Sequence, residues 1–173
     1  MSKWLAVISI ATLIGGCADS QHLIKGDTTL ASKLTSSDAV YVALPKDGSY
    51  DTKPYQGSGQ ITAQIIYSAF AKHAHSIEVG NSAQTFNEAL NSARNSGQKY
   101  LVYPVILHWE DRATEWSMIP DRVEVKIEVM DTTSKASLAS GVIKGKSGLA
   151  TFGGDHPQDL LPEPIEEFVS SLY

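Results

Sequence analysis

The chain contains a single cysteine, and this scarcity limits the kinds of site that it can build. One thiol cannot form an internal disulfide, and it cannot supply the several thiolates of a structural zinc or iron–sulfur site. Basic residues are also few, since 14 Lys and Arg stand against 19 Asp and Glu and the net charge is −5. A chain without excess positive charge lacks the main source of affinity for phosphate backbones, so nucleic acid is not an expected partner.

Long hydrophobic runs and internal repeats are missing as well. The longest apolar stretch, residues 4–14, has about 11 residues, whereas a bilayer-spanning helix needs roughly 20. No segment recurs at a fixed period, which argues against a solenoid or another repeat architecture. What is present is a chain of 173 residues with 42% hydrophobic residues, a size and composition typical of one globular domain with a single core.

The first 16 residues have the features of an export signal that ends at a lipidation site. Lys3 precedes the apolar stretch, and the segment Leu13-Ile14-Gly15-Gly16-Cys17 ends it. A positive residue, a short apolar stretch and small residues before a cleavage site are typical of a secretory signal peptide. The same segment resembles the lipobox of bacterial lipoproteins, in which the Cys thiol accepts a diacylglycerol and the Cys becomes the first residue of the mature chain. We therefore expect residues 1–16 to be removed and Cys17 to be acylated.

Acylation of Cys17 would fix the protein on a membrane. Each buried methylene contributes about 0.8 kcal/mol, so two or three chains of palmitate length bind a bilayer almost irreversibly. The residue after the cysteine is Ala18 and not aspartate, and in this position the chain resembles lipoproteins that are sorted to the outer membrane. The expected location is therefore the periplasmic face of the outer membrane, with the lipid bilayer as a partner through Cys17.

Two regions follow the signal peptide. Residues 17–37 are polar and show no sustained apolar period, so they predict an acylated cysteine followed by a flexible tether that spans roughly 25 Å. Residues 38–173 carry the apolar patterns of a single α/β domain.

The patterns within residues 38–173 predict the element order β-α-β-α-β-β-β-α. Helices are expected to begin near Ser58 and Ser82, and the last helix is expected to cover residues 164–173. The first of these helices should turn an apolar stripe toward the core, formed by Ile61, Ile65, Ile66, Ala69 and Phe70. Strands are expected at 39–44, 76–79, 100–110, 123–129 and 136–144. The fourth strand alternates strictly between apolar and charged residues, which is typical of an antiparallel strand with one buried face. Pro104 within the third strand indicates a sheet edge or a bulge, because proline cannot donate to the ladder. We expect a mixed, largely antiparallel sheet with helices packed on it.

The segment between the third and fourth expected strands holds the densest group of chemically versatile side chains. Its candidate binding residues are Trp109, Glu110, Asp111, Arg112, Glu115 and Trp116. In one interpretation the indoles form an aromatic platform, the guanidinium binds a carboxylate or phosphate, and a carboxylate acts as acid, base or cation ligand. In the other interpretation the indoles pin a long loop to the sheet, and the arginine pairs with a neighbouring carboxylate.

A second candidate segment is the turn Gly153-Gly154-Asp155-His156-Pro157. The glycines allow a bend, Asp155 or His156 suits a helix N-cap, and Pro157 suits the first helical position. The alternative is an acid/base or metal pair, although adjacent residues rarely aim at the same atom. No catalytic residue, resident metal or cofactor is assigned from these patterns.

Several of these segments resemble DUF4823, a family of bacterial lipoproteins whose domain has no known function. The matching stretches are the lipobox and residues 55–59, 109–117, 146–147 and 153–161. The resemblance implies no activity, so we expect a non-enzymatic, membrane-anchored periplasmic module that binds or assembles with another envelope component. The alternatives are a metal-dependent or acid/base hydrolase, or a small-ligand or glycan binder, using the 109–117 loop and the 153–157 turn.

Overall fold

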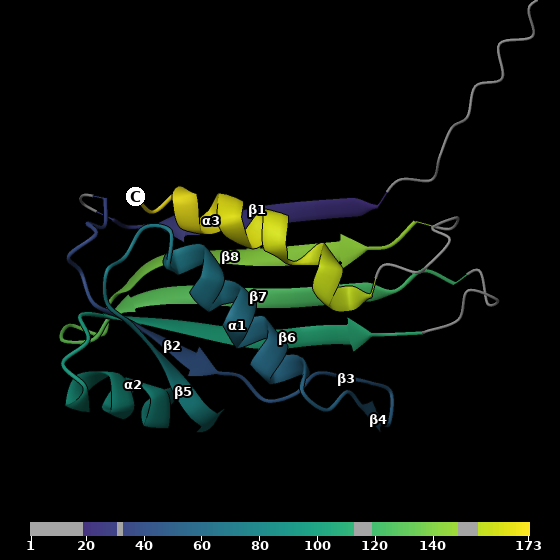
Figure 1. Ribbon diagram of the computed structural model, residues 1–173, viewed down its shortest axis with the longest axis horizontal. Helices are drawn as coiled ribbons and strands as arrows, with labels where there is room; N and C mark the ends of the chain where they lie inside the picture. The colour runs from purple at the N-terminus through teal and green to yellow at the C-terminus, as the bar shows by residue number, and fades with distance from the viewer. Residues whose placement is uncertain (1–18, 31–32, 113–118, 149–155) are drawn as a thin grey trace, which may run out of the picture.

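The computed structural model describes residues 19–30, 33–112, 119–148 and 156–173. Its centre is a six-stranded sheet made of β1 (Ser20–Thr28), β2 (Val40–Leu44), β5 (Ile77–Ala83), β6 (Tyr100–Glu110), β7 (Arg122–Asp131) and β8 (Ser137–Lys146). The strands lie in the order β1-β8-β7-β6-β2-β5 (Figure 1). β2 is parallel to β5 and β6, and the other neighbouring pairs are antiparallel. The predicted mixed, largely antiparallel sheet is confirmed.

Helices cover part of each face of the sheet. α1 (Ser58–Phe70), α3 (Pro162–Ser170) and the short 3₁₀ helix η1 (Pro157–Leu160) pack on one face. Figure 1 shows α1 and α3 side by side, with α3 contacting β1 and β8 and α1 contacting β2, β5 and β6. α2 (Phe86–Asn95) packs over a smaller cluster on the other face, and β3 (Ser49–Tyr50) and β4 (Lys53–Pro54) form a separate hairpin. From residue 38 onward, the predicted order of main elements is confirmed. No helix in the described part of the chain combines the length and hydropathy that a bilayer crossing requires.

The alternating strand β7 explains how the sheet separates core from surface. Its apolar side chains, Val123, Val125, Ile127 and Val129, are buried in the main core together with residues of α1, α3 and η1. The charged residues between them point to the opposite face, where Glu124 forms an ion pair of 3.1 Å with Lys144 on β8. This arrangement follows from the two-residue period of a strand.

Local details differ from the sequence-based expectations in two helices. Ser82 lies within β5, and α2 begins after Thr85, whose backbone N–H donates to the Glu88 carboxylate at 2.8 Å. This contact satisfies a free amide at the helix start, so Thr85 is the N-cap and the helix starts later than the expected Ser82. In α1, Ile66, Ala69 and Phe70 are buried as expected. Ile61 was expected on the same stripe but is 40% exposed, and Thr62 and Ala63 are buried instead. The prediction for Pro104 is confirmed, because β2 pairs with β6 only at residues 100–102 and leaves that side of Pro104 without a partner strand.

Residues 20–28 correct the expected extent of the tether. They form β1, an edge strand that pairs antiparallel with β8 from Ser20–Lys146 to Thr28–Ala139. Leu23 packs against the main core, while Ile24 is exposed. An edge strand obtains its stability from backbone hydrogen bonds to one neighbour, so it needs few apolar residues and lacks the pattern that identifies an inner strand.

A glycine in β8 sets the position of η1. A Cβ atom built on Gly145 would lie 2.6 Å from Cβ of Leu160 and 2.9 Å from Cγ1 of Val123. The missing side chain therefore lets η1 pack directly on the sheet with Leu160 fully buried. This close packing fixes His156, which immediately precedes η1.

Candidate functional site

One end of the sheet gathers residues from four strands. Ser20 of β1 pairs with Lys146 of β8, Lys146 pairs with Arg122 of β7, and Arg122 pairs with Glu110 of β6. These four residues lie in one row across the sheet, at the right-hand end in Figure 1. We call it the proximal end, because β1, the first strand, begins there.

A buried carboxylate organises the end of β6. Glu110 is 3% exposed, and its carboxylate accepts hydrogen bonds from Nε2 of His108 at 3.1 Å and from the guanidinium of Arg112. Arg112 also lies over the ring of Tyr50, 5.4 Å from its centroid. Burial by itself would raise the pKa of Glu110, but the hydrogen bonds from His108 and Arg112 and the positive charge of the guanidinium outweigh it, so this pKa lies below its ordinary value. Arg112 thus has the internal carboxylate partner of the second sequence-based interpretation.

We predict that Glu110→Gln lowers the free energy of unfolding by about 2 kcal/mol at pH 7, because the amide keeps the size of the side chain but loses its charge-assisted hydrogen bonds. The lowered pKa of Glu110 means that its contribution is complete above the ordinary value of 4.5 and disappears as the pH falls through the folded-state pKa. Urea denaturation at pH 7 and under acidic conditions measures both effects, and the difference from wild type shrinks in acid.

The matched control for this prediction is Glu124→Gln on β7. Glu124 pairs with Lys144 on the solvent-facing side of the sheet, and both side chains are partly exposed. Exposed ion pairs contribute little, so this change is expected to alter the free energy of unfolding by less than about 0.5 kcal/mol. Equal losses of unfolding free energy in the two variants would show that burial of Glu110 does not strengthen its contribution to stability.

Three further side chains converge beside Glu110. Asp111 follows β6, Asp121 precedes β7 and His156 precedes η1, and one potential metal-ligating atom from each lies within 4.8 Å of the others. Nδ1 of His156 is 3.5 Å from Oδ1 of Asp111. Asp121 is 7% exposed, and its Oδ1 accepts the backbone N–H of Arg112 at 2.6 Å. Burial, together with the nearby charges of Asp111 and Glu110, raises the pKa of Asp121 despite this hydrogen bond and the nearby imidazole.

The structure brings some predicted site residues together and separates another from them. Glu110, Asp111, Arg112 and His156 all lie at the proximal end. Trp109 is 2% exposed and belongs to the main core, so its indole does not form a surface platform and instead pins the end of β6 to the core. The remaining predicted residues, Cys17, Glu115, Trp116 and Asp155, lie outside the described residues.

Asp121 is the site residue that sequence reasoning missed. It is a single acidic residue before a strand, with no motif around it, and the strand was expected to begin only at Val123. Its position follows from strand pairing, because Glu110 pairs with Arg122 and the residues that flank this pair, Asp111 and Asp121, then face each other. Pairing the two expected strands in register would have found it.

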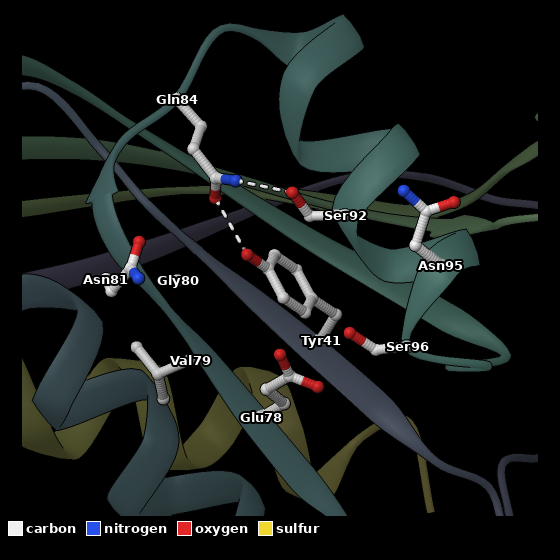
Figure 2. Close-up of a pocket in the computed structure, with 9 residues that line it drawn as sticks. All are labelled: Tyr41, Glu78, Val79, Gly80, Asn81, Gln84, Ser92, Asn95 and Ser96. Carbon is white, nitrogen blue, oxygen red and sulfur yellow. Dashed lines mark hydrogen bonds between the residues drawn. The ribbon is translucent and has the colours of Figure 1, made fainter.

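A separate pocket of about 300 Å³ lies between β2, β5 and α2 (Figure 2). At its centre the hydroxyl of Tyr41 donates to Oε1 of Gln84 at 3.1 Å, and Nε2 of Gln84 donates to Oγ of Ser92 at 2.9 Å. Gly80 makes room for this chain of hydrogen bonds, since a Cβ there would lie 2.5 Å from Oε1 of Gln84. The central polar groups therefore satisfy one another, and none of the sequence-predicted site residues lines this pocket.

Comparisons with known proteins identify the fold and the family. The chain is similar in structure to the PelC dodecamer from Paraburkholderia phytofirmans, with a TM-score of 0.66, 15% identity and coverage of 89% of this chain and 96% of that chain. It is also similar to lipoprotein GNA1162 from Neisseria meningitidis, with a TM-score of 0.50, 12% identity and coverage of 78% and 94%. At these identities the likeness shows a shared fold.

Sequence comparisons give a more specific result. A search of curated proteins finds no match. The profile of a domain of unknown function, DUF4823, matches residues 32–172, which include Glu110, Asp111, Arg112, Asp121 and His156. This match confirms the resemblance seen in the sequence, and the chain belongs to the DUF4823 family.

Proposed function

We propose that this DUF4823 protein is a lipid-anchored envelope protein whose domain binds or assembles with another component at the membrane surface and is not an enzyme. The lipobox at Cys17 supports the anchor, and Ala18 supports the outer membrane as its location. Two structural relatives agree with this role, since one is a lipoprotein and the other was solved as a dodecamer. The structural comparison with PelC covers 89% of this chain and 96% of the PelC chain, so the likeness extends over nearly the whole folded domain.

The observation that carries the proposal is the position at which the chain enters the sheet. β1 begins at Ser20, three residues after Cys17, and three residues span at most about 10 Å. The entry is held in place, because the backbone N–H of Gly148 donates to Oδ1 of Asp19 at 2.7 Å. An acylated Cys17 would therefore keep the proximal end close to the bilayer, and would not let the domain move on a long leash.

The surface chemistry of the proximal end suits a partner located at the membrane. Ile119 is 47% exposed there, and Arg122 and Lys146, which are paired across β7 and β8, are also exposed. An apolar side chain beside basic groups is suited to a partner that carries acidic and apolar groups at the bilayer surface. Such a partner is either a second copy of this chain or a different envelope protein.

A photo-crosslinking amino acid at position 119 tests this orientation in intact cells. We expect products with a membrane-associated protein in several-fold higher yield than from the same probe at Thr133, which lies in the turn at the opposite end of the sheet. The mass of the product distinguishes a second copy of the chain from a different component. Equal yields from the two positions, or no product from either, would contradict the proposal.

One observation favours a second candidate function. The structure brings Asp111 and His156 within 3.5 Å, although they are 45 positions apart in the sequence. This proximity is the arrangement that a metal-dependent hydrolase built from the 109–117 loop and the 153–157 turn requires. That candidate depends on whether the cluster binds a metal ion.

A further inference from the structure

We infer that Asp111, Asp121 and His156 form a binding site for a divalent transition-metal ion of the Zn²⁺ type. Their three potential ligand atoms come from three separate segments and lie within 4.8 Å of one another. The ligand atoms around a tetrahedral zinc ion are about 3.4 Å apart, as bond lengths near 2.1 Å require. Small side-chain rotations would therefore bring all three atoms onto one ion.

The donor set indicates which ions fit. Two carboxylates and one imidazole suit zinc and its first-row neighbours, whereas magnesium and calcium prefer sites made only of oxygen atoms. Three protein ligands also leave one coordination position open in a four-coordinate site. A water molecule or an oxygen atom of a partner would fill that position.

Surrounding contacts hold each of the three residues in place. Asp121 is fixed at two points, because its backbone N–H donates to Oγ of Ser147 at 2.8 Å and its carboxylate accepts the N–H of Arg112. The backbone N–H of His156 donates to Oδ2 of Asp159 at 3.0 Å. The hydroxyl of Tyr55 donates to the carbonyl oxygen of Asp111 at 3.1 Å. Partners of this kind orient metal ligands and increase their affinity.

The charge distribution supplies a second and independent argument. Asp121 is 7% exposed and lies near two other carboxylates, those of Asp111 and Glu110. The guanidinium of Arg112 is already engaged with Glu110. A buried carboxylate is costly unless a cation compensates its charge, and one divalent ion between Asp111 and Asp121 would provide that compensation.

The location of the site connects it to the proposed function. The three residues lie at the proximal end, next to the row formed by Glu110, Arg122, Lys146 and Ser20. If that end faces the bilayer, the metal site lies close to it, and a partner at the membrane could supply the remaining ligand. This consequence rests on the proposed function, whereas the metal site itself does not.

The test uses the full-length protein purified in detergent, stripped with a chelator and titrated with Zn²⁺ by calorimetry. We expect one equivalent to bind with micromolar or tighter affinity, and Mg²⁺ to give no comparable binding. Asp121→Asn and His156→Ala are expected to weaken Zn²⁺ binding at least 10-fold, as the loss of one ligand should. His75→Ala removes an exposed histidine at the far end of α1 and should leave the affinity unchanged.

Two further measurements keep the result interpretable. Asp121→Asn preserves the side-chain size and the hydrogen bond from Arg112, and circular dichroism of each variant shows whether the fold is retained. The visible absorption of bound Co²⁺ reports the coordination geometry directly. No saturable Zn²⁺ binding, or an equal loss of affinity in the His75→Ala protein, would overturn the site. Neither result would alter crosslinking from position 119, so failure of the metal site and failure of the membrane orientation are distinguishable.

Discussion

Replacing Cys17 with serine is expected to abolish palmitate incorporation and to remove essentially all of the protein from the outer-membrane fraction. The reason is chemical, because diacylglycerol transfer in bacterial lipoproteins requires the thiol and the serine hydroxyl does not replace it. Each lost methylene contact costs about 0.8 kcal/mol, so loss of two or three chains removes nearly all membrane affinity that the anchor provides. Metabolic labelling with palmitate and fractionation of the envelope measure both effects.

The neighbouring residue provides a matched control for this experiment. Ala18→Asp keeps the thiol, so we expect palmitate incorporation to continue while the protein shifts towards the inner membrane. The two variants thus separate acylation from sorting. Palmitate entering the Cys17→Ser protein, or wild-type protein isolated with an intact Met1 and a bare thiol, would contradict the proposed anchor.

A fixed proximal end would change what the proposed anchor does. With a tether of about 20 residues the domain would sample many orientations over a span of roughly 25 Å. With β1 starting at Ser20, most of that freedom is lost, because pairing with β8 occupies the residues that would have formed the tether. The short connection therefore makes orientation at the membrane part of the proposed function.

The sequence was informative wherever burial imposes a period on the chain. β6 was predicted at residues 100–110 and lies at Tyr100–Glu110. Its long run of β-forming residues identified it, and the buried start of the strand explains why that run is so apolar. β7 was identified from strict alternation, which places its valines in the core and its charges outside. The polar edge strand β1 has no such constraint, and only the pairing partner in three dimensions reveals it.

The candidate site could be predicted only in part, because local composition identifies polar segments but does not show which of them meet in the fold. Local composition drew attention to residues 109–112 and to His156, and the structure places all of them except the indole of Trp109 around one polar cluster. Composition cannot reveal which distant segments meet. The contact of Asp111 with His156 depends on the packing of η1 against Gly145, and the position of Asp121 depends on the register of β6 with β7.

Trp109→Ala is expected to lower the free energy of unfolding by about 4 kcal/mol, because the indole is 2% exposed and its removal leaves a large cavity in the main core. Gly48 shows how tightly the chain packs there, since a Cβ on Gly48 would lie 2.6 Å from Cβ of Trp109. The segment that leads into β3 rests on this side chain, so we also expect the cavity to loosen Tyr50, which contacts Arg112. Urea denaturation at neutral pH measures the loss.

Leu107→Ala is the matched control, because Leu107 lies on the same strand but is 50% exposed, and its loss is expected to change the free energy of unfolding by less than about 0.5 kcal/mol. The comparison separates the two interpretations of Trp109. If Trp109 has only a structural role, the Trp109→Ala change lowers stability. It then weakens crosslinking from position 119 only to the extent that the protein unfolds. If Trp109→Ala instead leaves stability within about 0.5 kcal/mol of wild type and eliminates crosslinking, then the indole contacts the partner directly, and its place in the core would have to be revised.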